Sequence, residues 1–369
     1  MQKVFQKLNS IISKKNLDGF IITNPYNILY LSGFKGISPT EREAILTVTK
    51  NNATLITVRL YQQEALALAN KNLSVKIAAE RNEIDKFILT SLKNSKTIGF
   101  EETDLKYSEF QKYKNLLKEV KLVPIKNLVE DIRVIKSEEE ISKIERAQII
   151  TQKAFVQIIK TLKIGQTETE IANRLADIIR SLGGQGLAFE PIIASGPNSG
   201  KPHHVTGDRQ LTNNDILLCD FGAKYQNYCA DFSRTVFIGR ATNVQRNIYN
   251  HVSTAQKKAL AIIEHGIKHH EPYNAANNHF RENKLDQYFT HSLGHGIGLE
   301  VHEAPYLRAK EVSNQPSTIN HQQLTTGMVF SIEPGLYFDW GGVRIEDLVT
   351  IKNGKLKVLG KLSEKLIEL

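Results

Sequence analysis

Three histidines lie close together in a glycine-rich stretch, F-T-H-S-L-G-H-G-I-G-L-E-V-H-E-A-P at residues 289–305. They are His291, His295 and His302. Imidazole is the commonest metal ligand in proteins and carries protons near neutral pH, so the stretch is a candidate for either chemistry. It does not fit the zinc-protease helix motif, which requires Glu after the first histidine, where this chain has Ser292. A phosphate-binding loop is the alternative, although a lone run of glycines is weak evidence for one.

Four acidic residues stand in segments that are otherwise apolar and are expected to form strands. They are Asp220, Asp231, Glu333 and Glu346. Asp is disfavoured inside strands, and a buried carboxylate without a partner costs on the order of several kcal/mol. Buried salt bridges are the alternative explanation, because Arg234 and Arg344 lie nearby in the sequence. Two arginines can serve one or two of the acids, but the salt-bridge explanation must account for four.

Carboxylates and one imidazole, from His295, form a hard ligand set that suits manganese, cobalt or zinc. Four carboxylates carry four negative charges, so one divalent ion leaves about two uncompensated, whereas two ions bring the set to neutrality. Carboxylates can bridge such a pair of ions. The pair lowers the pKa of a bridging water and polarises a carbonyl group, which is the chemistry of hydrolysis.

The elements that position these residues are expected to form a second domain, from residue 136 to 369. Two capping boxes, Ser137 with Glu140 and Thr167 with Glu170, predict the starts of two helices. Strands carrying the acids follow, and a further helix is expected at about 243–265. The order helix–helix–strands, then helix–strands, predicts an α+β domain built from two similar halves.

Residues 1–125 alternate short apolar runs with amphipathic segments and predict a separate α/β domain. Strands are expected at Gly19–Thr23, Ile45–Val48 and Ala53–Val58, and helices at Leu60–Ala69, Ile84–Leu92 and Tyr107–Leu117. This region holds no histidine and no cysteine, since all eleven histidines lie from position 203 onward. We therefore expect it to serve dimerisation or substrate gating, not metal chemistry.

Composition excludes several classes of protein. The net charge is +9, but the lysines are spread along the whole chain without a basic arm, which argues against nucleic-acid binding. No apolar run is long enough for a membrane span or a signal peptide, so a cytoplasmic protein is expected. The two cysteines, Cys219 and Cys229, are not expected to pair. In a hairpin formed by the segment between them, Cys229 would share a face with Asp231, whereas Cys219 would face opposite to Asp220.

The chain resembles the pita-bread metallopeptidases, which include methionine aminopeptidase, aminopeptidase P and prolidase. The resemblance rests on D-F-G-A-K-Y-Q-N-Y-C-A-D, G-H-G-I-G-L-E-V-H-E-A-P, S-I-E-P-G-L-Y and G-G-V-R-I-E-D. N-P-Y-N-I-L-Y-L-S-G-F at 24–34 looks like the N-terminal domain of the proline-directed members, which methionine aminopeptidases lack. The resemblance implies a creatinase-like α/β domain followed by an α+β pita-bread catalytic domain of the creatinase/aminopeptidase type.

Carried over position by position, the resemblance implies five metal ligands. Asp220 would bind one ion and His295 with Glu333 the other, while Asp231 and Glu346 would bridge. It also implies that Glu333 shuttles a proton. The remaining roles concern the substrate: His203 near the scissile bond with His204 as a less favoured neighbour, His302 at the scissile carbonyl, His291 in the proline pocket, and Arg344 and Tyr337 as substrate contacts or supports of the ligands.

The implied activity is hydrolysis of Xaa-Pro bonds in small peptides with proline at the second position, by a homodimer with two divalent ions, Mn²⁺ first and Co²⁺ or Zn²⁺ as alternatives. Xaa-Pro dipeptidase and Xaa-Pro aminopeptidase stay open as alternatives. So does a non-catalytic peptide-binding or protein-binding member of the same fold, although such relatives lose metal ligands and all five are present here. Two loop positions depart from the family pattern, Asn227 where Gly is usual and Gly200 where Ala is frequent.

Overall fold

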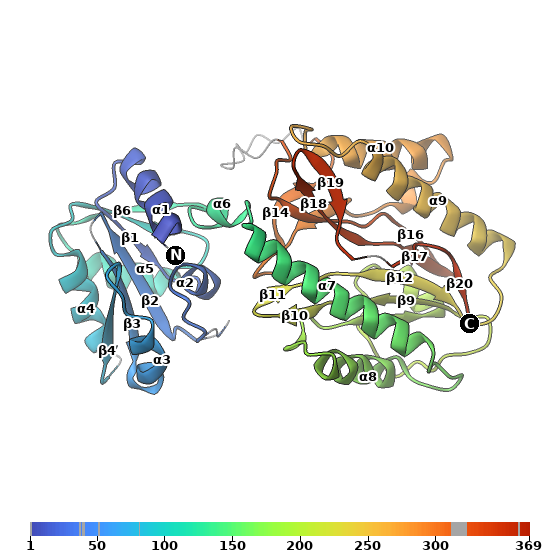
Figure 1. Cartoon of the computed structure of the whole chain (residues 1–369), viewed down its shortest axis with the longest axis horizontal. Helices are drawn as coiled ribbons and strands as arrows, with labels where there is room; N and C mark the ends of the chain where they lie inside the picture. The colour runs from blue at the N-terminus through green and yellow to red at the C-terminus, as the bar shows by residue number, and fades with distance from the viewer. Residues whose placement is uncertain are drawn as a thin grey trace. The chain divides into compact units, whose positions relative to one another are not determined.

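The computed structural model describes the chain except residues 1, 37, 39, 40, 51, 81, 311–322 and 361. The chain divides into two compact units, Met1–Ile132 and Arg133–Leu369 (Figure 1). Among the described residues, no helix has both the length and the apolar character that crossing a membrane requires.

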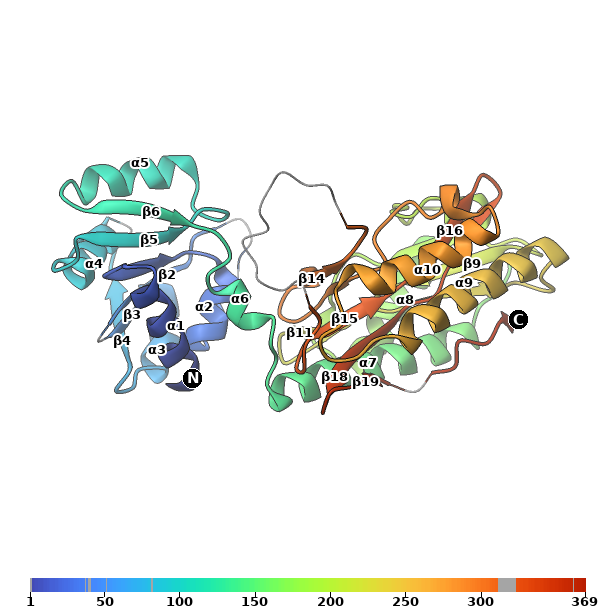
Figure 2. The same ribbon diagram turned by 90° about the horizontal axis from the view of Figure 1, so that it is seen from above.

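The first unit is a mixed sheet with helices on both faces (Figure 2). Its strands are β1 (Gly19–Ile22), β2 (Ala44–Thr49), β3 (Ala53–Val58), β4 (Leu73–Ala78), β5 (Thr97–Glu101) and β6 (Lys121–Ile125). Its helices are α1 (Gln2–Lys14), α2 (Pro25–Ser32), η1 (Arg59–Tyr61), α3 (Gln62–Ala67), α4 (Glu83–Leu92), α5 (Tyr107–Leu116) and α6 (Glu130–Arg133), the last ending at the division between the units. The strand order is β4–β3–β2–β1–β5–β6.

The alternation of side chains along β1 explains the two layers of helices. Successive residues of a strand point to opposite faces, so Phe20 and Ile22 face one side of the sheet and Ile21 the other. Phe20 and Ile22 belong to a core that includes residues of α1, α2 and α6. Ile21 belongs to a second core with α4 and α5. The expected α/β architecture of this region is confirmed.

The second unit contains two pairs of helices and several short sheets. Its helices are α7 (Glu138–Ile159), α8 (Glu168–Ser181), η2 (Gly196–Gly200), α9 (Asn243–Ala261), α10 (His270–Glu282) and η3 (Asp286–Tyr288). Its strands are β7 (Gly186–Leu187), β8 (Ile192–Ser195), β9 (Ile216–Asp220), β10 (Ala223–Tyr225), β11 (Tyr228–Cys229), β12 (Ser233–Phe237), β13 (Gly294–Gly296), β14 (Glu303–Leu307), β15 (Val329–Ile332), β16 (Gly335–Phe338), β17 (Gly341–Arg344), β18 (Asp347–Lys352), β19 (Lys355–Val358) and β20 (Ile367–Glu368).

Each pair of helices covers its own set of strands. Helices α7 and α8 share a core with β8, β9 and β12, whose sheet has the order β20–β12–β9–β8. Helices α9 and α10 share another core with β15 and β18, from the sheet β14–β13–β15–β18–β19. The strands therefore lie between the two pairs (Figure 1).

Both predicted capping boxes of this unit are confirmed. The side chain of Ser137 accepts from the backbone N–H of Glu140, and Thr167 does the same with Glu170. Helix α10 was not expected, because the sequence analysis placed a single helix at about 243–265. With α10 included, the second half also reads helix–helix–strands. Both cysteines are buried free thiols, as expected.

Candidate metal centre

The four acids of the second unit lie at strand ends or in breaks between strands. Asp220 is the last residue of β9, and Asp231 lies in the break between β11 and β12. Glu333 directly follows β15, and Glu346 lies between β17 and β18. The expectation that all four sit inside strands is therefore wrong. Side chains alternate between faces within a strand, and an interruption frees a side chain from that alternation so that several can converge.

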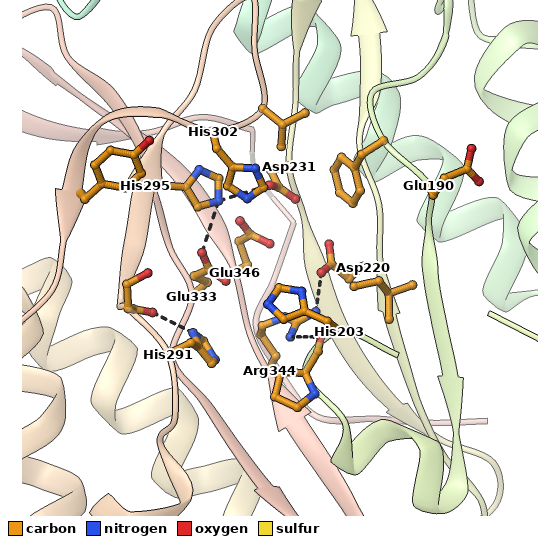
Figure 3. A pocket seen from close by; sticks show the side chains of 16 residues that line it. Glu190, His203, Asp220, Asp231, His291, His295, His302, Glu333, Arg344 and Glu346 are labelled. Carbon is orange, nitrogen blue, oxygen red and sulfur yellow. Dashed lines mark hydrogen bonds and ion pairs between the residues drawn. The ribbon is translucent and has the colours of Figure 1, made fainter. Parts of the chain in front are cut away.

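These acids border one cavity of about 440 Å³ (Figure 3). Among the predicted site residues, all but Tyr337 and the less favoured His204 line it: His203, Asp220, Asp231, His291, His295, His302, Glu333, Arg344 and Glu346. Tyr337 is buried beside the cavity and contacts two of its lining residues. The lining also includes residues that the sequence analysis did not single out, among them Phe189, Val301 and Tyr306.

His295 is oriented as a metal ligand. Its Nδ1 lies 3.1 Å from the carbonyl oxygen of Gly296, to which it donates, so Nε2 keeps its lone pair. Nε2 lies 3.4 Å from Glu333 Oε1 and 3.6 Å from Asp231 Oδ2. Burial, with a smaller effect of His302, lowers the pKa of His295 to about 4, so the ring is neutral near pH 7. A lone pair that faces carboxylate oxygens is repelled by them unless a cation lies between.

The carboxylates themselves lack sufficient countercharge. Ligand atoms of Asp231, His295 and Glu346 all lie within 4.8 Å of one another. Burial raises the pKa of Asp231 well above its ordinary value, and the charges of Asp220 and Glu333 raise it further. Burial and the charge of Asp231 do the same for Glu346. The pKa of Glu333 rises to about 8, mainly through burial.

Two carboxylate oxygens in this cluster have no hydrogen-bond partner among the described residues, Asp220 Oδ1 and Glu346 Oε1. Buried polar atoms nearly always have a hydrogen-bond partner, so these two oxygens are free to coordinate a ligand from outside the protein. Together with the lone pair of His295, they fit divalent cations, whose charge would also lower the raised pKa values.

The salt-bridge explanation accounts for only one of the four acids. Arg344 Nη2 contacts Asp220 Oδ2. Arg234 instead pairs with Asp347, 2.7 Å away, and contacts Glu346 only through its backbone carbonyl, at 2.6 Å. One arginine therefore faces four carboxylates, and three negative charges lack a basic partner among the described residues.

Comparison with known proteins follows the same division of the chain. Residues 142–353 match metallopeptidase family M24, and residues 5–135 match the creatinase/prolidase N-terminal domain. The chain belongs to metallopeptidase family M24. It is therefore an enzyme, a hydrolase whose family uses divalent metal ions. The predicted fold class, an α/β domain followed by an α+β pita-bread catalytic domain, is confirmed.

Proteins named as Xaa-Pro peptidases align with nearly the full chain. The chain is 35% identical over 368 residues to a Xaa-Pro dipeptidase of Pyrococcus horikoshii, which covers 100% of this chain and 99% of that protein. Among solved structures, a Xaa-Pro dipeptidase from Bacillus anthracis has a TM-score of 0.92 and 30% identity, covering 100% and 99% of the two chains. An X-Pro aminopeptidase from Thermotoga maritima has a TM-score of 0.84 and 33% identity, covering 96% and 98%.

In this M24 chain, two hydrogen bonds connect Arg344 to His291 through the hydroxyl of Tyr337. Arg344 Nη1 donates to Tyr337 Oη at 2.7 Å, and the Tyr337 hydroxyl donates to His291 Nε2 at 2.9 Å. His291 Nδ1 then donates to the carbonyl of Ser292 at 2.7 Å. Burial and the charge of Arg344 lower the pKa of His291 to about 3, so the ring is neutral. Both nitrogens of His291 are thus occupied, and its ring presents an apolar face to the cavity.

The other two histidines of the M24 cavity, His302 and His203, come from segments far apart in the sequence (Figure 3). His302 packs against His295 with ring centroids 4.2 Å apart, and burial lowers its pKa. His203 comes from the segment after η2, beside Asp220 and Arg344 (Figure 3). The arrangement therefore places several imidazoles around the carboxylate cluster.

Two pairings at the site were not predicted from the sequence. His204 does not line the cavity, since its Nε2 lies 2.7 Å from Glu168 on α8. Glu303, next to His302, pairs with Arg133 and, at 3.2 Å, with Lys136. Glu168 was not noticed because an acid in the first turn of a helix is ordinary. The consecutive histidines at 203 and 204 were the one available signal.

The two departures from the family pattern have local explanations. Asn227 adopts a φ of +69°, in the left-handed region that Gly adopts without steric cost and that Asn tolerates. A Cβ on Gly200 would lie 2.1 Å from the carbonyl oxygen of Phe338, so alanine would require the backbone to move. Both departures therefore concern turns and leave the carboxylate cluster unchanged.

Proposed function

We propose that this chain is a two-metal exopeptidase that hydrolyses Xaa-Pro bonds in dipeptides or short peptides, with Mn²⁺ preferred over Co²⁺ or Zn²⁺. The observation that carries the proposal is the convergence of four carboxylates and the His295 lone pair on one cavity, opposite a single arginine. When all four carboxylates are ionised, as metal binding requires, that set has a net charge of about −3, which one divalent ion leaves negative and two make positive. A positive site favours the negative charge that develops on a carbonyl oxygen during hydrolysis.

The residues would divide between the ions as the family resemblance implies. Asp220 would hold one ion, His295 with Glu333 the other, and Asp231 with Glu346 would bridge. When bound, the ions would supply a nucleophile from water and polarise the scissile carbonyl. The unpartnered oxygens of Asp220 and Glu346 support this division, because each has coordination capacity that no described protein group uses.

The side chains of the protein would handle the substrate and its protons. Glu333 would take up a proton from the attacking water and return it to the leaving nitrogen of proline. His302, neutral through burial, would donate its N–H to the scissile carbonyl oxygen. His203 would contact the substrate near the scissile bond. His291, held by Tyr337 and Arg344, would offer its ring face to the pyrrolidine ring.

Two arguments support a preference for proline: relatives of this chain are named as Xaa-Pro peptidases, and the Xaa-Pro bond has unusual chemistry. An Xaa-Pro bond has no amide N–H, and its backbone is restricted, so a site that relies on that N–H handles it badly. A pocket that accepts the ring by apolar contact suits it. The relatives include both a Xaa-Pro dipeptidase and an X-Pro aminopeptidase, so the proposal covers both peptide lengths.

Cleavage of three peptides tests the proposal. After removal of metal with EDTA and addition of Mn²⁺, we expect release of alanine from Ala-Pro and none from Ala-Ala. Ala-Pro-Ala separates the two alternatives, because equal rates on Ala-Pro and Ala-Pro-Ala contradict a strict dipeptidase. Failure to cleave either proline peptide with Mn²⁺, Co²⁺ or Zn²⁺ would overturn the proposal.

The proposal includes a homodimer in which residues 1–125 serve dimerisation or substrate gating. That region contains no histidine or cysteine, which supports a role outside the metal chemistry. Sedimentation velocity of the full chain tests the dimer, and a purely monomeric protein at micromolar concentration contradicts it.

A further inference from the structure

His203 projects into the cavity from a segment without regular structure, so something must hold it in place. It lies between Pro202 and His204, after the short helix η2. The carbonyl of Pro202 accepts a hydrogen bond from β17, and the side chain of His204 contacts α8. The position of the His203 backbone therefore depends on both anchors.

The first anchor is Arg344 at the end of β17. Its Nη1 donates to the carbonyl oxygen of Pro202 at 3.2 Å, while its Nη2 contacts Asp220. The same side of the segment is tied to β17 by the backbone N–H of Gly342, which donates to Ser199 Oγ at 2.9 Å. The N-terminal side of His203 is thus fixed relative to one of the acids of the cluster.

The second anchor is Glu168, whose side chain is 0% exposed. Its Oε1 accepts from the backbone N–H of Ser195 at 2.7 Å, the Ser195 hydroxyl at 2.7 Å and the Asn198 amide at 3.0 Å. Its Oε2 lies 2.7 Å from His204 Nε2 and accepts from the backbone N–H of Gly207 at 3.2 Å. One carboxylate therefore joins the beginning of the segment, at 195 and 198, to its end, at 204 and 207.

The groups around Glu168 favour an ionised acceptor. The backbone N–H groups and the Asn198 amide can only donate to it, and the Ser195 hydroxyl, whose oxygen accepts from Arg209 Nη1 at 2.6 Å, can donate its own hydrogen to Glu168. Burial raises the pKa of Glu168, but these hydrogen bonds outweigh burial and hold it below its ordinary value. Its place in the first turn of α8 also favours a negative charge.

We propose that Glu168 and His204 are positioning residues: their buried hydrogen bond holds the 195–207 segment so that the His203 imidazole stays directed into the cavity. The inference rests on the proposed function in that His203 contacts the substrate. It assigns His204 a different role from that of a second substrate contact, because His204 does not line the cavity and its Nε2 is occupied. Misplacement of a substrate-contacting group by about 1 Å can cost on the order of 100-fold in rate.

The test uses the full-length protein and variants of four residues, His203, His204, Glu168 and Tyr249. His204→Leu removes the hydrogen bond, and His204→Gln retains a donor that can reach Glu168. Glu168→Gln keeps the shape of the anchor and removes its charge, and serves as the second variant if His204→Leu does not fold. Tyr249→Phe is the matched control. It deletes the hydrogen bond of 2.9 Å from the hydroxyl of the buried Tyr249 to the carbonyl of Glu364, and Tyr249 does not line the cavity.

Kinetics on Ala-Pro, with His203→Ala as a second background, give the first readout. We expect His204→Leu to lower kcat by about 10- to 100-fold, His204→Gln to lose only a few-fold, and Tyr249→Phe to match the wild type. We also expect His203→Ala/His204→Leu to be no slower than His203→Ala alone, because the anchor has nothing left to position. An equal effect of His204→Leu with and without His203 would overturn the inference, since a purely structural role predicts that result.

Amide hydrogen exchange of the 195–207 segment gives the second readout, which is independent of activity. Faster exchange in His204→Leu and Glu168→Gln, but not in His204→Gln or Tyr249→Phe, supports the inference. Exchange equal to that of the wild type in all variants overturns it. If the wild type cleaves no Xaa-Pro peptide, the proposed function fails, and the exchange data alone then decide whether this pair holds the segment.

Discussion

The imidazole of His295 shows how single residues at this site are prepared for a cation. Its Nδ1 is engaged by its neighbour's carbonyl, and its Nε2 lone pair faces two carboxylates. Such an arrangement is unfavourable in the bare protein and becomes favourable when a metal ion accepts the lone pair. The same holds for the unpartnered oxygens of Asp220 and Glu346.

Residue type and spacing singled out the four acids, as charged groups in apolar segments, and the three histidines of the glycine-rich stretch 289–305, whereas His203 was indicated by the family resemblance alone. The partners of these groups were not predictable. Arg234 and Arg344 are equally near the acids in sequence, yet only Arg344 reaches one of the four. Which arginine pairs with which acid depends on the sheet register, and the sequence carries that information only weakly.

Asp231→Asn tests the bridging role at the level of one residue. The change removes one anionic ligand and keeps the shape of the side chain, so we expect the fold to persist while kcat on Ala-Pro falls by about 100-fold or more. Losses of 10- to 100-fold are common even for residues that only support a ligand. Circular dichroism provides the control for folding. Retention of more than a few per cent of wild-type activity contradicts the bridging role.

Glu333 makes the stability of the metal-free protein depend on pH. Its pKa is raised to about 8 from 4.5, mainly by burial, so its protonated form favours the folded state. The stabilisation is complete below pH 4.5 and is lost as the pH rises through about 8. We therefore expect the Tm of the EDTA-treated protein to fall between about pH 4.5 and pH 8, and Glu333→Gln to reduce that fall. An equal slope in Glu333→Gln would contradict this assignment.

At the scale of elements, the sequence predicted what local signals encode and missed what packing decides. The capping boxes of α7 and α8 are local signals and were predicted correctly. Helix α10 was missed because its sequence, H-E-P-Y-N-A-A-N-N-H-F-R-E, is polar and contains Pro272. Helix α10 is stabilised by the burial of Ala276 and Phe280 in the core that it shares with α9. The spacing of apolar residues in the sequence gives little sign of this burial.

Glu303 secures the segment that carries His302. Its carboxylate is buried between Lys136 and Arg133, which hold its pKa at about 2 despite burial. We expect Glu303→Gln to lower the free energy of unfolding by about 3–5 kcal/mol near pH 7, because it removes the buried anion that pairs with both Lys136 and Arg133 and leaves Arg133 only the partly exposed Glu300. Urea denaturation measures the change.

The neighbouring Glu300→Gln is the matched control for that change. Glu300 also contacts Arg133, but its side chain is 32% exposed, so we expect a loss of about 1 kcal/mol or less. The sign with pH is also determined: the contribution of Glu303 is present above its ordinary pKa of 4.5 and is lost as the pH falls toward 2. Equal destabilisation by both variants would contradict the buried ion pair.

At the scale of the whole molecule, the metal centre belongs entirely to the second unit. Every predicted ligand lies within Arg133–Leu369. The sequence predicted two domains from the distribution of histidines and from the change of pattern near residue 125. It could not predict that Arg133 and Lys136, in the connecting stretch, would pair with Glu303, because that contact spans about 170 residues.

A fragment of the chain tests the independence of the second unit. We expect residues 133–369 to fold cooperatively and to bind Mn²⁺ as the full chain does, because the ligands and their supports are complete within it. A fragment that begins at Ser137 lacks Arg133 and Lys136, so we expect a lower Tm for it. Scanning calorimetry measures both. A 133–369 fragment without a cooperative transition would contradict the prediction.

The metal content of the purified chain tests the central proposal most directly. After loading with Mn²⁺ and dialysis, elemental analysis of the wild type should find two ions per chain, and peptidase activity should rise in proportion as metal-free protein is titrated to two equivalents. Full activity at one equivalent, or no bound metal in a folded wild-type protein, would contradict the account.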